Sequence, residues 1–148
     1  MRDSILISKL LINIEVWPHL SEAQIRKFEQ TDLSFQKKLL KCPVSTNTEI
    51  VHSELNSILF KFLIMKRRLM YHWNILIRNS NELVSRVHRA MTLQPSKTDW
   101  CSQITKDKNC LEITLSDGDI SSFLKERYKK YVSEKVKTRR LSFLRELQ

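Results

Sequence analysis

The stretch from Leu59 to Asn79 constrains the fold more than any other part of the sequence. Apolar residues recur in it at intervals of three and four positions, which forms one wide apolar stripe on an α-helix. Lys66, Arg67 and Arg68 interrupt this apolar run within one turn. We therefore expect a central helix with a buried stripe flanked by a basic cluster. The stripe consists of Phe62, Leu63, Met65, Leu69, Met70, Trp73, Leu76 and Ile77.

The scarcity of turn-forming residues favours helices throughout the chain. One Gly and three Pro in 148 residues are too few for a β architecture, which needs frequent Gly and Pro turns. A chain of this length forms one domain or a pair of small helical lobes. We expect an all-α, irregular multi-helix bundle of about five to seven helices, with a long basic helix at the C-terminus.

The first half of the chain carries several helix boundaries. Ser4–Ile14 is expected to be a helix that ends before Trp17-Pro18, because the residue before proline avoids the α region. Ser21-x-x-Gln24 is a capping box that opens a second helix, which Pro43 stops.

Thr46-x-x-Glu49 is a second capping box, which opens a helix through about Leu55. This helix either continues into the central one or breaks at Asn56-Ser57. Ser80 or Asn81 is expected to cap the helix that follows.

Pro95, within Gln94-Pro95-Ser96, marks the best candidate boundary between a larger helical region, 1–93, and a smaller one, 94–148. In the second region, Ser96-x-x-Asp99 is expected to start a short helix with Trp100 and Ile104. Cys110–Leu115 is expected to be an extended connection, and Ser122–Leu147 the terminal helix.

Charge is the most informative property for function. The net charge is +10 and the sequence pI is about 9.7, a balance that favours polyanionic partners such as nucleic acid. The terminal helix carries nine basic residues and three acidic ones, with a second cluster at Lys135, Lys137, Arg139 and Arg140. Contacts from such clusters to phosphates would be independent of base sequence and sensitive to salt. A helical protein with a merely basic surface is the alternative.

Aromatic residues near these clusters have two interpretations. Tyr71, Trp73, Tyr128 and Tyr131 could stack on bases or pack in the core, and the core is favoured.

The sequence gives no positive evidence of an active site. Gly118 is the only glycine, so no glycine-rich phosphate loop is possible, and Asp117-Gly118-Asp119 fits helix capping better than metal binding. The four histidines are dispersed, and the three cysteines form no CxxC pair. We expect no catalytic residues, no metal site, no cofactor and no disulfide framework.

A membrane location is not expected either. Residues 59–77 are long enough to span a bilayer, but each of the three central cations would cost roughly 2.5–3.5 kcal/mol there. The apolar run Ile5–Ile14 is short, contains Lys9 and lacks a cleavage site for a signal peptide. We therefore expect an intracellular protein of the nucleus or cytoplasm that is not secreted.

Several motifs occur together in an order typical of one family. They are Leu11-x-x-x-Glu15-x-Trp17, Phe28-Glu29-x-x-x-Leu33-x-x-x-Lys37-Lys38-Leu39-Leu40, Pro43-x-Ser45-Thr46-x-x-Glu49, Glu54-Leu55, Lys66-Arg67-Arg68-Leu69-x-Tyr71, Ile75-Leu76-x-Arg78-Asn79 and Lys97-x-Asp99-Trp100. Their order resembles the region after the polymerase core in non-LTR (LINE-type) retrotransposon reverse transcriptases. The resemblance covers nearly the whole chain. Asn56 departs from it, since relatives usually have glycine there.

The resemblance implies a thumb-like or linker helical region in residues 1–93, which helps to hold the RNA template and the primer. Lys66, Arg67, Arg68 and Arg78 would form its phosphate-facing patch. The Tyr-x-Asp-Asp polymerase motif, an endonuclease motif and a Cys/His knuckle are all absent from the sequence. The resemblance therefore implies a non-catalytic fragment of an RNA-directed DNA polymerase that binds RNA or DNA, and Met1 would be the first in-frame methionine of a truncated element.

Two alternatives to this function stay open. The chain could be a helical protein-interaction module whose amphipathic helices pack on the remainder of a reverse transcriptase. It could also be a non-functional relic of a mobile element. Residue types alone do not separate these alternatives from nucleic-acid binding.

Overall fold

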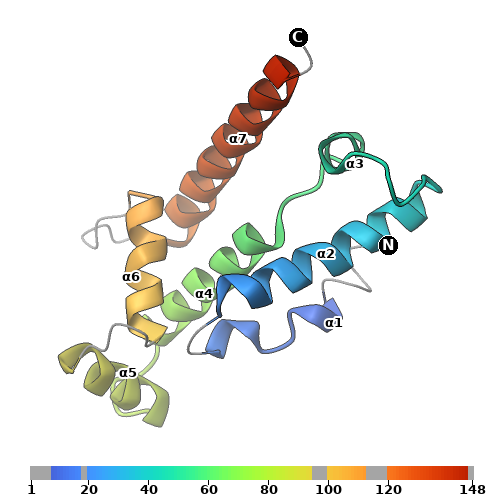
Figure 1. The fold of residues 1–148 in the computed structure, drawn as a ribbon. Helices are drawn as coiled ribbons and strands as arrows, with labels where there is room; N and C mark the ends of the chain where they lie inside the picture. Colours follow the sequence, from blue (N-terminus) through green and yellow to red (C-terminus); the bar gives the residue numbers. More distant parts are fainter. Residues whose placement is uncertain (1–7, 18–19, 95–99, 113–119, 147–148) are drawn as a thin grey trace. The chain divides into compact units, whose positions relative to one another are not determined.

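The computed structural model describes residues 8–17, 20–94, 100–112 and 120–146, with side chains from residue 125 onward in the last range. Within these residues the secondary structure is all-α, with helices joined by turns and no strands (Figure 1). The expected fold class is therefore confirmed. The helices are α1 (Ser8–Leu10), the 3₁₀ turn η2 (Ile14–Val16), α2 (Glu22–Leu39), α3 (Thr48–Glu54), α4 (Phe60–Leu76), α5 (Leu83–Leu93), α6 (Trp100–Cys110) and α7 (Ile120–Glu146).

The chain forms two compact units, each built from segments that are distant in sequence. Unit 1 comprises Met1–Ile12, Ser21–Leu63 and Lys130–Gln148, and unit 2 comprises Asn13–Leu20 and Ile64–Lys129. The units are discontinuous because α4 and α7 each contribute residues to both. The expected division into regions 1–93 and 94–148 has a different boundary from those of the two units, and it stays a prediction.

In unit 1, helix α2 begins as expected. The Ser21 hydroxyl accepts from the Gln24 backbone N–H at 3.3 Å, and the Gln24 side chain accepts from the Ser21 backbone N–H at 2.9 Å. The helix ends at Leu39, before Pro43, because Lys41 adopts a left-handed backbone with φ of 52°.

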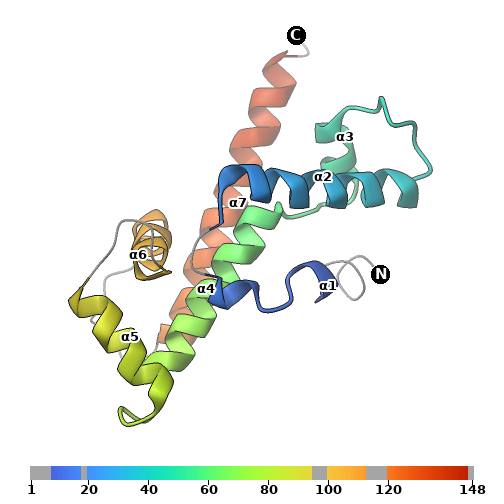
Figure 2. The ribbon, with the colours of Figure 1, turned by 60° about the horizontal axis from the view of Figure 1, so that its bottom comes forward.

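Helix α3 begins one residue later than expected. Its N-cap is Asn47, whose side chain accepts from the Glu49 backbone N–H at 2.8 Å, so the Thr46 capping box is wrong. The helix ends before Asn56, which has a φ of 45°, and α4 starts separately at Phe60. Of the two alternatives that the sequence left open, the structure therefore has the break at Asn56-Ser57. Figure 2 shows α2 and α3 lying side by side.

The N-terminus of α4 is fixed to α2 by both apolar and polar contacts. The rings of Phe28 and Phe60 stack with centroids 6.2 Å apart, and Phe60 is fully buried. The Glu29 carboxylate accepts from the Lys61 backbone N–H at 3.1 Å. The first N–H groups of a helix lack intrahelical acceptors, so Glu29 supplies one of them from a neighbouring helix.

A buried polar network joins α2 to the connection between α3 and α4. The Gln36 side-chain N–H donates to the Asp32 carboxylate at 2.6 Å, and both residues are fully buried. The Ser57 hydroxyl donates to the Gln36 carbonyl at 3.0 Å, and His52 Nδ1 lies 2.5 Å from Ser57 Oγ. These four side chains hold the residues just before α4 against α2.

Unit 2 has its core around the rest of α4, where the buried face differs from the expected stripe. Leu76 and Ile77 are exposed, whereas Arg68 and His72 are buried together with Leu69. The expected stripe is wrong at Leu76 and Ile77, and it omits Arg68 and His72. These two polar residues are buried because they have partners inside the unit, which hydropathy does not reveal. Helices α5 and α6 lie next to each other in the same unit (Figures 1 and 2).

Two expected boundaries are corrected in this unit. The N-cap of α5 is Glu82, without a side-chain cap bond, in place of Ser80 or Asn81. Cys110 belongs to α6, so the expected extended connection does not begin there.

At the N-terminus, α1 ends at Leu10 because Asn13 takes a left-handed backbone with φ of 54°, and the expected helix through Ile14 is wrong. Residues 4–7, the helix start expected at 96–99, residues 113–115 and the turn expected at 117–119 lie outside the described residues. The terminal helix is confirmed as α7, with 27 residues. Among the described residues, no helix is both long and apolar enough to cross a membrane.

Glu29 gives a test of the contact that begins α4. Burial raises the pKa of its carboxyl above 4.5, while the backbone N–H groups of Lys61 and Phe60 act in the opposite direction. The folded state therefore favours the protonated acid, and stability falls as the pH rises through the raised pKa. Urea unfolding should show Glu29→Gln to be more stable than the wild type at pH 7, with the difference lost near pH 4.

Glu29→Ala, by contrast, leaves the Lys61 N–H without its acceptor, and we expect a loss of roughly 0.5–2 kcal/mol at pH 7. The control is Glu134→Gln, which removes the charge of an exposed side chain on α7. A Glu29→Gln variant less stable than the wild type at pH 7 would contradict this account.

Candidate nucleic-acid interface

The eight basic residues expected to bind phosphate fall into two groups. Lys66, Arg67, Arg68 and Arg78 belong to unit 2, on α4 and just after it. Lys135, Lys137, Arg139 and Arg140 belong to unit 1, on α7. Each group is therefore a separate candidate.

Arg68 has a structural role inside unit 2. Its guanidinium donates two hydrogen bonds to the Asp107 carboxylate, at 2.8 and 3.0 Å, and the two side chains are only 9% and 10% exposed. Burial raises the pKa of Asp107, and the bond and charge of Arg68 act against that rise. Two of the five N–H donors of Arg68 are thus bonded to Asp107 on α6 inside the unit, and a phosphate contact of Arg68 stays a prediction.

The other basic residues of unit 2 lie nearer the surface. Lys66 is exposed, with its ammonium 5.5 Å from the ring centroid of Tyr128. Arg67 is half-buried. Arg78 is exposed and lies 3.7 Å from Glu82 one turn later, a pair in which both side chains are about half exposed. Lys66 is thus the residue of this group best placed to meet a ligand.

The aromatic residues of unit 2 are mostly core residues. Tyr128 is buried, and burial raises its pKa to about 12. Tyr71 packs edge-on against Trp100 with ring centroids 5.9 Å apart, and the Trp100 indole N–H donates to the Glu15 carbonyl at 2.7 Å. The core interpretation of Tyr71 and Tyr128 is favoured by these contacts.

His72 and His88 form an aromatic cluster with Trp100 in the same unit. Their ring centroids lie 5.1 Å apart, and both rings lie within about 6 Å of the indole. Burial lowers the pKa of His72 to about 3, with smaller effects of Lys108 and His88, and burial and Lys108 lower the pKa of His88. Both imidazoles are neutral at physiological pH. The described residues contain no group of three side chains that could hold a metal ion.

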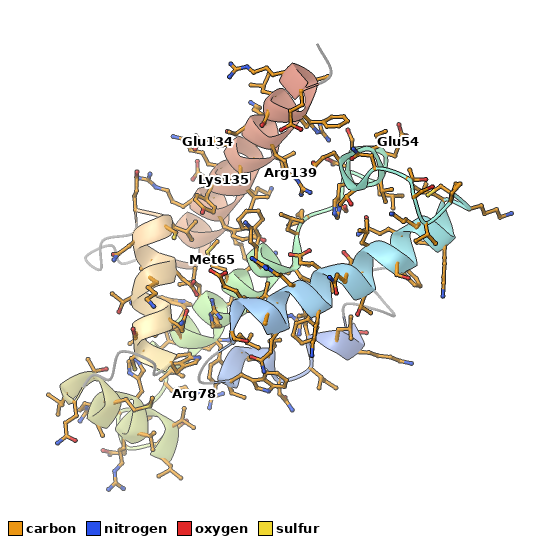
Figure 3. The ribbon with its side chains drawn as sticks, in the orientation of Figure 1. Glu54, Met65, Arg78, Glu134, Lys135 and Arg139 are labelled. Carbon is orange, nitrogen blue, oxygen red and sulfur yellow. The ribbon has the colours of Figure 1, made fainter. Side chains whose placement is uncertain are left out.

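In unit 1, the four expected residues of α7 have different partners. Arg139 is half-buried, and its Nε donates to the Glu49 carboxylate on α3 at 2.7 Å. Arg140 donates to the Asn56 side-chain oxygen at 3.2 Å. The Lys135 ammonium lies 5.5 Å from the Tyr131 ring centroid, and Lys137 is exposed. Figure 3 shows Lys135 and Arg139 one turn apart on α7.

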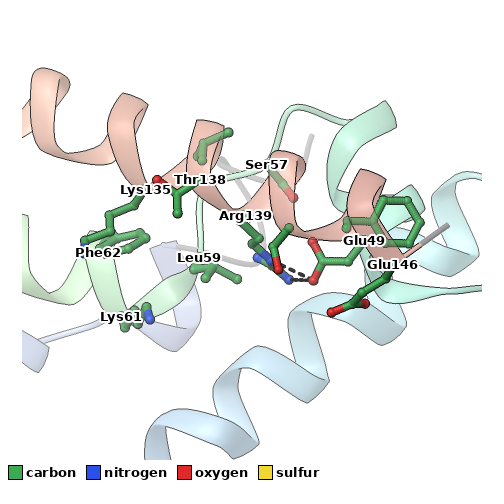
Figure 4. Close-up of a pocket in the computed structure, with 12 residues that line it drawn as sticks. Glu49, Ser57, Leu59, Lys61, Phe62, Lys135, Thr138, Arg139 and Glu146 are labelled. Carbon is green, nitrogen blue, oxygen red and sulfur yellow. Dashed lines mark hydrogen bonds and ion pairs between the residues drawn. The ribbon is translucent and has the colours of Figure 1, made fainter. Parts of the chain in front are cut away.

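A cavity of about 340 Å³ lies beside this part of α7 (Figure 4). Its lining comes from α3, the start of α4 and α7, all within unit 1. Sequence reasoning missed it because no single segment supplies more than one side. Three of its lining residues had been noted in the sequence for other reasons: Lys135 and Arg139 as candidate phosphate ligands, and Phe62 as part of the apolar stripe.

Comparisons with known proteins identify no relative. No protein-family model matches the chain. No match is found among curated proteins or among solved structures. The resemblance to non-LTR reverse transcriptases accordingly stays a prediction from the motifs.

The Arg68–Asp107 pair predicts an effect on stability. Arg68→Ala leaves a buried carboxylate without its cation, and we expect a loss of roughly 3–5 kcal/mol in urea unfolding. Lys66→Ala, two residues earlier and exposed, should change stability by no more than about 0.5 kcal/mol. The double variant Arg68→Met with Asp107→Leu should recover most of the loss, because no charge is then left buried. Equal stability of Arg68→Ala and Lys66→Ala would contradict a structural role for the pair.

Proposed function

We propose that this chain is a non-catalytic, helical nucleic-acid-binding module that contacts the phosphate backbone of RNA or DNA through α7. The proposal keeps the function implied by the resemblance to the post-polymerase region of non-LTR reverse transcriptases. It moves the main contact surface from α4 to α7, because Arg68 is buried and bonded to Asp107.

The exposed cations in residues 130–146 are the observation that carries this proposal. This segment of α7 has six basic residues and two acidic ones. Lys130, Lys137 and Arg140 are exposed and spaced by seven and three positions, so they share one helix face. For Lys130, Lys137 and Arg145, the described part of the chain provides no carboxylate within ion-pair distance. A row of unneutralised cations on a rigid helix matches a polyanion.

The same resemblance suggests the partners and the cellular location of this chain. The partners are RNA or DNA, bound without base specificity, and the remainder of a reverse transcriptase. The location is the nucleus or the cytoplasm. Lys66 and Arg78 of unit 2 are secondary candidates for phosphate contact, since both are exposed.

A pair of matched variants tests the α7 surface. Lys130→Gln with Lys137→Gln should weaken binding of a labelled RNA hairpin, measured by fluorescence anisotropy over a series of salt concentrations. Each lost phosphate contact lowers the steepness of log affinity against log salt by about 0.7–0.9, so we expect a decrease of about 1.4–1.8 for the two contacts.

The control is Lys27→Gln with Lys38→Gln, which removes the same charge from exposed positions of α2 in the same unit. Equal losses in both double variants would assign binding to net charge alone and contradict the α7 surface. Absence of wild-type binding at low salt, by protein with a helical circular dichroism spectrum, would reject the function itself.

A second candidate function, a protein-interaction module, has its own observation. Large apolar side chains are exposed in unit 2 at the end of α4 and on α5. Leu83 is 71% exposed and Val87 49%, and they lie one turn apart on the same face of α5. An apolar helix face of this kind is a possible contact surface for another protein. The residues concerned are Leu76, Ile77, Leu83, Val87 and Leu93.

This second function predicts self-association of the purified chain. Light scattering should show a mass above that of the monomer, and Leu83→Gln with Val87→Gln should lower it. Arg86→Gln with Arg89→Gln, at exposed positions of the same helix, is the control. A wild-type chain that stays monomeric at high concentration would count against an interaction surface on α5.

A further inference from the structure

The cavity beside α7 has the size and lining of a small-ligand site. Its volume of about 340 Å³ falls within the roughly 300–1,000 Å³ of such sites. Leu59, Val136 and Phe143 supply apolar surface, and Phe143 is half-buried. A flat apolar group could therefore rest against its wall.

One end of the cavity carries two cations beside aromatic rings. The Lys61 ammonium lies 5.0 Å from the ring centroid of Phe62, and the Lys135 ammonium lies 5.5 Å from that of Tyr131. Phe62 and Tyr131 pack edge-to-face with centroids 5.8 Å apart. Each ammonium group thus lies near one ring of the same packed aromatic pair. Both lysines are exposed to solvent.

The opposite end of the cavity carries carboxylates. Figure 4 shows Glu49 and Glu146 at the end away from Lys61 and Lys135. Glu49 is held by Arg139 through its Nε and Nη2 atoms. Glu146 is exposed and lines the cavity without an ion pair among the described residues. A ligand that fits both ends has an anionic part, a flat part and hydrogen-bond donors, in that order.

We propose that this cavity binds one unpaired base of a single strand of RNA or DNA. The base rests on the apolar wall formed with Phe143, and the phosphate next to it lies at Lys61 and Lys135. Amino groups on the base edge donate to Glu146, as carboxylates accept from cytosine N4. This inference rests on the proposed function and adds a preference for single strands, because a paired base stays stacked in its duplex.

An acidic peptide is the competing occupant, and the lining disfavours it. A peptide carboxylate could meet Lys61 and Lys135, but further carboxylates would approach Glu146 at the other end. A nucleotide carries its negative charge on the phosphate alone and presents a neutral, flat base to the rest of the cavity. Charge and shape therefore favour the nucleotide.

The test compares a labelled 12-nucleotide single strand of mixed sequence with a blunt duplex of the same sequence, using the full-length chain and anisotropy. Phe143→Ala removes the wall, and stacking of one base is worth about 1–3 kcal/mol, so affinity for the single strand should fall about fivefold or more. The slope against salt should not change, because no phosphate contact is lost. Binding of the duplex should stay the same.

Leu144→Ala is the matched control, since Leu144 is adjacent, apolar and 55% exposed, and does not line the cavity. Ser142→Leu is a second test that keeps the wall and fills the cavity from an exposed position of α7. It should weaken single-strand binding as Phe143→Ala does. If Phe143→Ala fails to fold, Ser142→Leu alone tests whether the cavity binds a base.

The outcomes separate this inference from the proposed function. Loss of single-strand binding in both variants, with normal duplex binding, supports the cavity as a base site. Unchanged single-strand binding in a folded variant, or an equal loss for single strand and duplex, overturns the cavity while leaving phosphate binding by α7. Displacement of the single strand by a glutamate-rich peptide, in a manner that depends on Phe143, also overturns it. Failure of the wild type to bind either nucleic acid rejects the proposed function itself.

Discussion

The position of α4 in unit 1 depends on the need to satisfy buried polar groups on α2. Asp32 and Gln36 are fully buried, and a polar side chain in that position destabilises the fold unless it is hydrogen-bonded. Gln36 donates to Asp32 and accepts from Ser57, and Ser57 in turn contacts His52. These bonds fix the orientation of each side chain in the network. Because Ser57 lies just before α4, the same bonds place Leu59 and Lys61 at the cavity. A substitution of Gln36 would therefore alter the lining of the cavity, although Gln36 itself does not line it.

Signals that act over a few residues were sufficient to predict most helices. The capping box at Ser21 and the long basic α7 are properties of short segments, and both are confirmed. The break at Asn56 is the one of two open alternatives that the structure has. The predictions failed where tertiary contacts determine which side chains are buried. The family resemblance implied that Arg68 faces phosphate, yet Arg68 is buried with its partner, Asp107, which lies 39 residues away. No periodicity in the sequence points to that pairing.

The candidate site shows the same limit more strongly. The basic character of α7 was evident from composition, and the exposure of Lys137 agrees with it. The cavity was not predictable, because its lining combines α3, the start of α4 and α7 across about 90 positions, as the Arg139–Glu49 bond illustrates. Charge counts could indicate a class of partner, whereas only the folded chain indicates where a flat group could fit between the cations and the carboxylates.

The left-handed residues just after α2, α3 and α6 have a consequence for the evolution of this chain. Lys41 after α2, Asn56 after α3 and Glu112 after α6 all have positive φ, a conformation that glycine adopts most readily. For residues with a Cβ atom the cost is roughly 1–2 kcal/mol each, although asparagine tolerates it better. Thermostable descendants of this sequence could thus arise by glycine replacements at Lys41 and Glu112. Both positions are exposed, so such changes would leave the packing of either unit and the lining of the cavity as they are.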